Sequence, residues 1–170
     1  MTLLLSIDPG KSTGWSVWEY DALTPLRHLA HGTTPDGLRG FLQWWNTSWT
    51  AQHFRTYGGD LVAEDFILDG RTLIPNTMPL EILGALEVLW PGYARQRNVM
   101  KAHVTDDTLK HLDLWWKGKG HDRDSARHAI AFMKVRRHAP TLRWLSGRDV
   151  TQTAHQGDVT QIAHEREENE

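Results

Sequence analysis

Three acidic residues stand where a metal-dependent hydrolase would need them. Asp8 follows a short apolar run, Glu64 ends the run Leu61-Val62-Ala63, and Asp124 lies in the first turn of a long helical segment. Carboxylates crowded together repel one another unless a cation neutralises them. Two Mg²⁺ ions about 4 Å apart can do this, and they activate water and stabilise the leaving oxygen in phosphodiester cleavage. If the fold gathers these residues, they predict that chemistry.

Each of the three also has an ordinary structural interpretation. Asp8 begins the segment Asp-Pro-Gly, and the dipeptides Asp-Pro and Pro-Gly are both common in turns. Glu64 could be a solvated strand end. Asp124 could be a helix-start acid that the helix dipole favours. The interpretation as a site therefore depends on the elements that position the three residues.

The hydrophobic pattern predicts a mixed α/β fold. Short apolar or alternating runs predict strands, and the first two pair antiparallel across the turn after Asp8. Longer amphipathic runs predict helices, the first capped by Asp36 and the second beginning at Thr77 with a proline near its start. The order β-β-β-α-β-α-β-α-α favours a five-stranded mixed sheet with helices on both faces, in which the first and fourth strands can be parallel neighbours. The strands are expected at 3–7, 14–18, 26–31, 61–63 and 93–97, and the helices at 37–53, from 77 to 90, 106–115 and 122–137.

Composition sets broad limits on function. The 170 residues are 39% hydrophobic and 24% charged, as in an ordinary soluble domain. The chain has no cysteine, which excludes disulfides, thiolate catalysis and cysteine-based zinc sites. The apolar run at the start is too short for a signal peptide, and no run approaches the ~20 apolar residues of a membrane span. We therefore expect a cytoplasmic protein.

Charge divides the chain into two parts. Residues 146–170 carry six acidic residues and two arginines, a net charge of −4, whereas residues 1–145 have a net charge of +2. The last part is also polar and lacks periodicity. We expect one folded domain over 1–145 and a mobile acidic tail over 146–170. The overall acidity of the chain therefore does not argue against nucleic-acid binding by its body.

Four blocks in this order resemble the RuvC-type Holliday-junction resolvases. They are LLLSIDPGKSTGWSVW, LVAEDF, MPLEILGALEVLW and KGHDRDSARHAIAF, and the resemblance covers roughly residues 3–137. The longer segment that includes the fourth block, VTDDTLKHLDLWWKGKGHDRDSARHA, looks most like small phage-encoded RuvC-like endonucleases. The sequence departs from the family at Ser125, where alanine is usual.

The resemblance implies an RNase H-like fold and a function. The function is that of a metal-dependent endonuclease, which hydrolyses phosphodiester bonds in branched DNA and resolves Holliday junctions by a two-metal mechanism. It implies two Mg²⁺ or Mn²⁺ ions per site, a homodimer acting on a four-way junction, and a host-cytoplasmic location if phage-encoded. The family's catalytic and metal-binding residues correspond here to Asp8, Glu64, His121 and Asp124. Asp65 and Asp122 neighbour these positions and are possible substitutes.

Basic and aromatic residues near the last two helices suggest a DNA-binding surface. Lysines and arginines that neutralise phosphates give salt-dependent affinity, although a solvated basic face is the alternative. Trp115 and Trp116 suit stacking on an unpaired base, but one tryptophan of such a pair is usually part of the core. The candidate DNA contacts are Lys11, Lys101, Lys110, Lys117, Lys119, Arg123 and Arg127.

Other functions remain open. The same fold could serve a nuclease of flaps, forks or RNA–DNA hybrids, or a non-catalytic junction-binding module. Sugar kinases and actin-like ATPases begin with a similar hairpin, but they need a second domain that 170 residues cannot supply. A P-loop is excluded because Leu5 stands where that motif needs a glycine.

Overall fold

The computed structural model describes residues 1–68, 76–118 and 120–147. Nearly all of the expected acidic tail, from residue 148 onward, lies outside the described residues, and so does Lys119. The domain boundary expected at 145 coincides with the end of the last helix described, and it stays a prediction.

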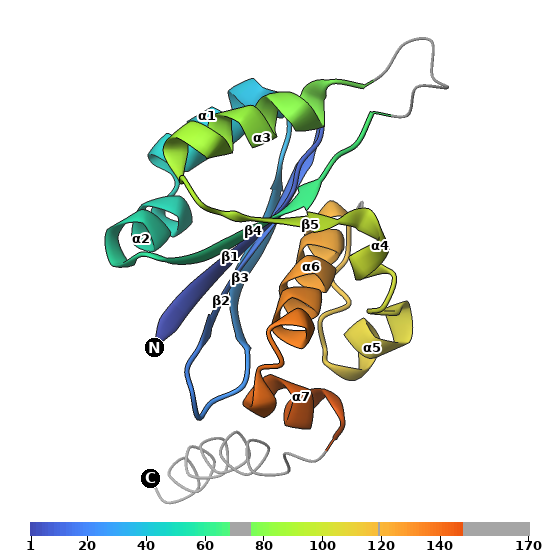
Figure 1. The fold of residues 1–170 in the computed structure, drawn as a ribbon. Coiled ribbons are helices and arrows are strands. Elements are labelled where there is room, and N and C mark those ends of the chain that lie inside the picture. Colours follow the sequence, from blue (N-terminus) through green and yellow to red (C-terminus); the bar gives the residue numbers. More distant parts are fainter. Residues whose placement is uncertain (69–75, 119, 148–170) are drawn as a thin grey trace, which may run out of the picture.

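One five-stranded sheet forms the centre of the molecule (Figure 1). Its strand order is β3-β2-β1-β4-β5. β1 pairs antiparallel with β2 and parallel with β4, while β5 pairs parallel with β4. The predicted mixed sheet, with its first and fourth strands as parallel neighbours, is therefore confirmed. The strands are β1 (Thr2–Asp8), β2 (Thr13–Tyr20), β3 (Arg27–Thr34), β4 (Gly59–Asp65) and β5 (Ala94–Arg97).

Helices cover both faces of this sheet, as predicted (Figure 1). Successive side chains of a strand point to opposite faces, so Leu3 and Leu5 join one buried cluster and Leu4 joins another. Side chains of the helices over residues 37–47, 49–57 and 78–89 fill the first cluster. The helix over residues 121–135 supplies the largest share of the second cluster. The helices are α1 (Gly37–Thr47), α2 (Trp49–Tyr57), α3 (Met78–Leu89), α4 (Asn98–Lys101), α5 (Asp106–His111), α6 (His121–Val135) and α7 (Ala139–Leu145).

The single helix predicted over 37–53 is wrong, because the chain breaks at Ser48. Ser48 is extended, and its side chain accepts a hydrogen bond from Ala51 N, so it ends α1 and caps α2. Asp36 does not cap α1 either: it has a left-handed backbone and makes no capping hydrogen bond. The predicted cap at Thr105 is present, but its helix ends at His111. α4 and α7 were not predicted.

Small residues let α6 lie close to the sheet. Ser6 of β1 donates to the Ser125 carbonyl at 2.7 Å, and the Ser125 hydroxyl donates to Ser16 of β2 at 3.0 Å. Gly14 of β2 faces the start of the same helix, where an added Cβ would lie 2.0 Å from the His121 carbonyl oxygen. The first turn of α6, which carries Asp124, is therefore fixed against the β1–β2 hairpin.

Gly14→Ala is expected to lower stability by about 2 kcal/mol, or roughly 6 °C in Tm, because the methyl group must push the start of α6 off the sheet. Thermal unfolding followed by circular dichroism measures this. Gly84→Ala is the matched control, since a Cβ there meets nothing within 4 Å. Equal Tm values for the two variants would contradict the close approach of α6 to β2.

Candidate metal centre

The topology brings the ends of two central strands together. Ile7 of β1 is in register with Ala63 of β4 in the parallel pairing. The next residue on each strand is Asp8 and Glu64, so these two carboxylates occur at the same level of adjacent strands. α6 packs against both strands and adds Asp124 from its first turn. The structure therefore brings together the three acidic residues singled out in the sequence.

The ammonium group of Lys101 lies among the three carboxylates. Its Nζ is 2.7 Å from Glu64 Oε2, 3.2 Å from Asp124 Oδ2 and 3.8 Å from Asp8 Oδ1. The lysine side chain is only 19% exposed. Although burial opposes its charge, Asp8 and Glu64 raise the pKa of Lys101, so the group stays an ammonium ion. The centre of the cluster is thus a position where a cation is stabilised.

His121 completes one side of the cluster. Its Nδ1 is 3.3 Å from Asp8 Oδ2, and the side chain is 41% exposed. The hydrogen bond with Asp8 raises the pKa of His121. The structure therefore gathers the three carboxylates around Lys101 and places His121 against the other oxygen of Asp8.

The two strand-end carboxylates differ in their protonation. Burial is the largest influence on Asp8 and raises its pKa to about 6, against the lowering effect of His121. Burial also opposes ionisation of Glu64, but hydrogen bonds involving His128, Asp8 and Lys101 outweigh it and lower its pKa to about 2. Adjacent carboxylates in a buried site avoid carrying two full charges at once. Glu64 is consequently the one that stays ionised.

The side chains of the cluster suit a hard divalent cation, provided that Lys101 moves out of the cluster. Asp8, Glu64 and Asp124 supply carboxylate oxygens, which are the ligands that Mg²⁺ and Mn²⁺ prefer, and His121 adds an imidazole nitrogen beside them. Within the described residues, however, no three such side chains are already spaced around one ion. The Lys101 ammonium holds the carboxylates around itself instead. The residues therefore fit divalent ions once Lys101 withdraws.

Two other acids considered from the sequence have partners elsewhere. Asp122 is buried, and its Oδ2 lies 2.9 Å from His31 Nδ1 of β3. Asp65 lies 3.6 Å from Arg95. Asp65 points to the opposite side of β4 from Glu64, as strand alternation predicts. Neither acid is placed as a substitute ligand.

The basic residues divide into distinct groups. Arg127 is only 13% exposed; it donates to Asp124 Oδ1 at 2.5 Å and pairs with Asp106. It therefore positions Asp124 rather than presenting its charge to solvent. Arg123 donates to the carbonyls of Trp116 and Gly118 and stabilises the loop before α6. Lys11, Lys110 and Lys117 are exposed and available to phosphates.

The two adjacent tryptophans have different surroundings. Trp116 stacks on His31 with ring centroids 3.6 Å apart and packs near Trp18, so it belongs to the interior. Trp115 is 39% exposed and lies under the Arg123 guanidinium, at 4.1 Å. Lys110 also lies over the Trp115 ring, at 5.1 Å, so Trp115 is the more exposed of the pair but already has two cationic neighbours.

Sequence reasoning missed several residues at the site. His128 is fully buried beside Glu64, and Gln96 of β5 contacts its other nitrogen. Arg97 lines a hollow of about 290 Å³ that Glu64 also borders. A histidine inside an amphipathic helix and a glutamine in a four-residue strand give no motif to search for. Only the tertiary structure brings them to the carboxylates.

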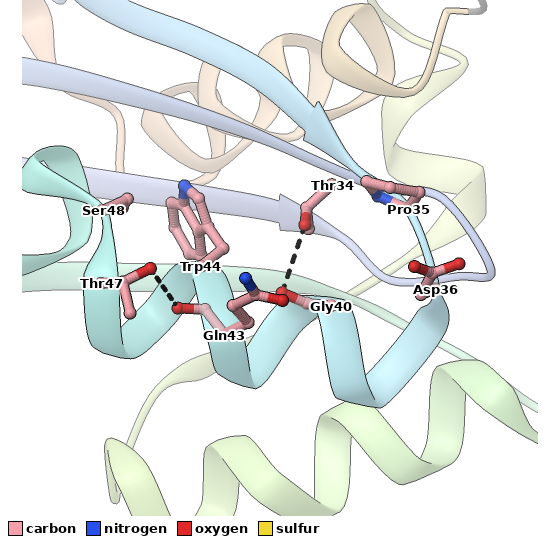
Figure 2. Close-up of a pocket in the computed structure, with 8 residues that line it drawn as sticks. All are labelled: Thr34, Pro35, Asp36, Gly40, Gln43, Trp44, Thr47 and Ser48. Atoms are coloured by element: carbon pink, nitrogen blue, oxygen red, sulfur yellow. Dashed lines mark hydrogen bonds between the residues drawn. The ribbon is translucent and has the colours of Figure 1, made fainter.

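A second hollow, of about 340 Å³, lies along α1 and the end of β3 (Figure 2). Thr34 donates to the Gly40 carbonyl and Thr47 to the Gln43 carbonyl, while the buried Nε1 of Trp44 has no hydrogen-bond partner among the described residues. It contains none of the four clustered residues. The chemistry of the side chains, rather than the size of a hollow, therefore identifies the candidate site.

The sheet order, with acidic residues at the ends of its two central parallel strands, defines an RNase H-like fold of the RuvC type. T. thermophilus RuvC in complex with a Holliday junction substrate superposes with a TM-score of 0.60 and 12% identity, covering 82% of this chain and 98% of that chain. A second Thermus thermophilus RuvC structure gives a TM-score of 0.58 and 14% identity, covering 80% and 96%.

Sequence comparison adds nothing to this structural likeness. No protein-family model matches the chain, and no curated protein matches it significantly. At 12–14% identity the two RuvC structures establish the fold. Across the described residues, no helix is long and apolar enough to cross a membrane.

Proposed function

We propose that this protein is a Mg²⁺- or Mn²⁺-dependent endonuclease that cuts branched DNA, with Holliday junctions as its main substrate. One observation carries the proposal: carboxylates from two parallel strands and from the last long helix converge on a single buried cation. Carboxylates gathered in this way repel one another and destabilise the fold unless a cation lies among them.

Each residue has a part in the proposed reaction. Asp8, Glu64 and Asp124, with His121, would hold two divalent ions. Bound there, the ions would activate water and stabilise the leaving oxygen. His121, partly exposed and hydrogen-bonded to Asp8, is placed to orient the attacking water or to accept its proton. Arg127 keeps Asp124 in place, and Lys101, once displaced, is a cation beside the scissile phosphate.

The choice of branched DNA rests on the structural comparison and on the surface. The RuvC structure that resembles this chain was solved with a Holliday junction. Lys117 is exposed four residues before α6, and it is placed to contact a phosphate there. Symmetric cutting of a four-way junction needs two active sites, so we propose a homodimer.

Incubation of the purified protein with a labelled four-way junction, with and without Mg²⁺, tests the proposal. The expected result is Mg²⁺-dependent cutting near the branch point, mapped on a denaturing gel. A flap, a fork and an RNA–DNA hybrid of the same sequence should be cut more slowly. If one of these three substrates is cut faster than the four-way junction, the proposed metal-dependent hydrolysis stands, but the proposed main substrate is wrong.

A non-catalytic junction-binding module is the second candidate. The position of Lys101 favours it, because an ammonium already neutralises the carboxylates without any metal. In that case, added Mg²⁺ would change neither junction cutting nor thermal stability. An increase in Tm with Mg²⁺ would decide for the metal-dependent function, since binding to the folded state alone raises stability.

A further inference from the structure

His128 is a fully buried histidine directly behind the candidate metal centre. It lies one helical turn after Asp124 on α6, and its Nε2 is 3.0 Å from Glu64 Oε2. Its Nδ1 is 2.9 Å from the side-chain amide of Gln96, on the edge strand β5. The proposed reaction does not use this histidine, so its burial at this point needs another explanation.

The hydrogen-bond pattern around Gln96 locates the imidazole proton. With the amide nitrogen of Gln96 toward α6, it donates to His128 Nδ1 at 2.9 Å and to the His128 carbonyl at 3.0 Å. The amide oxygen then accepts from Phe132 N at 3.2 Å. In the reverse orientation of the Gln96 amide, its oxygen would face only hydrogen-bond acceptors and its nitrogen would face only donors. Nδ1 is therefore an acceptor, and the proton is on Nε2.

A proton on Nε2 makes His128 a donor to Glu64. The carboxylate oxygen Oε2 then accepts from His128 and also from Lys101, at 2.7 Å. Lys101 must leave when divalent ions enter, whereas His128 is enclosed by the core and stays. The histidine is thus the donor that still holds Glu64 in the ion-bound state.

We propose that Gln96 and His128 form a positioning pair for Glu64. The pair fixes the carboxylate through one hydrogen bond to Oε2 and so sets its orientation toward the cation position that Lys101 now occupies. The inference rests on the proposed metal centre, and it assigns roles to two residues that do not touch substrate. Hydrogen-bond partners that orient a ligating carboxylate commonly matter 10–100-fold for metal affinity or activity.

Two substitutions of His128 test whether it acts by donating a hydrogen bond to Glu64 or only by filling space in the core. In His128→Gln the side-chain amide reaches the place of Nε2 and can still donate to Glu64. In His128→Asn the shorter amide matches Nδ1, so it can contact Gln96 but not Glu64. Both side chains are polar and of similar size, so they disturb the core comparably.

The readout is the affinity for Mn²⁺ alone, measured by titration calorimetry on protein whose fold is verified by circular dichroism. His128→Asn is expected to weaken Mn²⁺ binding by about 10–100-fold, and His128→Gln by only about threefold. His103→Asn is the control, because His103 is exposed. If His128→Asn fails to fold, Gln96→Leu replaces it, and weaker Mn²⁺ binding is again expected.

An independent measurement uses nitrogen NMR of the imidazole rings in the metal-free protein. The expected spectrum for His128 has a proton on Nε2 and a bare Nδ1. A proton on Nδ1, or equal Mn²⁺ affinities for wild type and His128→Asn, would overturn the inference and leave the proposed function intact. No Mn²⁺ binding by the wild-type protein would instead overturn the metal centre, and the inference with it.

Discussion

Glu64→Gln is expected to reduce Mg²⁺-dependent cleavage of a four-way junction by about 10³-fold or more, since a bound metal supplies several kcal/mol of transition-state stabilisation. Asp8→Asn should act in the same way. Each change removes a negative charge and a ligand oxygen but keeps the size of the side chain. Both residues are buried at strand ends, where amides can still be accommodated.

Single-turnover cleavage rates measure this loss, and gel-shift titrations in Ca²⁺ measure junction binding, which should survive. Asp65→Asn is the matched control. It alters the next residue on β4, whose carboxylate lies near Arg95 on the other side of the strand. Full cleavage by either site variant would refute the assigned chemistry. Loss of cleavage in Asp65→Asn as well would point to a structural effect of charge on β4.

Lys101→Met is expected to tighten Mn²⁺ binding by roughly tenfold, because the divalent ion no longer competes with an ammonium a few ångströms from the same carboxylates. The metal-free variant should lose about 3 kcal/mol of stability, since the carboxylates lose a part-buried counter-ion. Methionine keeps the length of the lysine side chain, so charge is the main change.

Calorimetric titration with Mn²⁺ gives the affinity, and thermal unfolding with and without Mn²⁺ gives the stability. Lys110→Met provides the comparison, because it removes a lysine whose partner, Asp107, is exposed. A metal affinity that is unchanged or weaker in Lys101→Met would show that the lysine does not occupy the ion position. The cleavage rate is a poor readout here, because in the proposed reaction Lys101 also acts on the scissile phosphate.

The sequence predicted the strands and most helices because these depend on local patterns, and it predicted the meeting of the three acids from the expected strand order and from the resemblance to the RuvC-type resolvases. The run before Asp8 and the run before Glu64 are short and apolar, which is typical of central strands, and parallel pairing then sets their ends side by side. The start of the last long helix at His121 was expected within one residue. The mixed five-stranded sheet with helices on both faces is confirmed. The metal-binding roles stay predictions.

Contacts between distant segments could not be predicted. Lys101 was expected to bind DNA as part of a basic face, but the short helix α4 turns its side chain into the acidic cluster. Arg127 was expected to bind DNA, and it pairs with Asp124 and Asp106. Trp115 and Trp116 looked equivalent until the stack on His31 separated them. Each outcome depends on which neighbour the fold supplies, and hydrophobic periodicity carries no such information.

The serine contacts that attach α6 to β1 and β2 also affect when the site can exist during synthesis. Ser6 and Ser125 are 119 positions apart, and the clustered acids are separated almost as widely. Contacts of such long sequence separation form late in folding. A nascent or prematurely ended chain without α6 would carry Asp8 and Glu64 without the rest of the cluster. The proposed metal centre, and the proposed DNA cutting with it, would thus be absent until nearly all of the folded domain is complete.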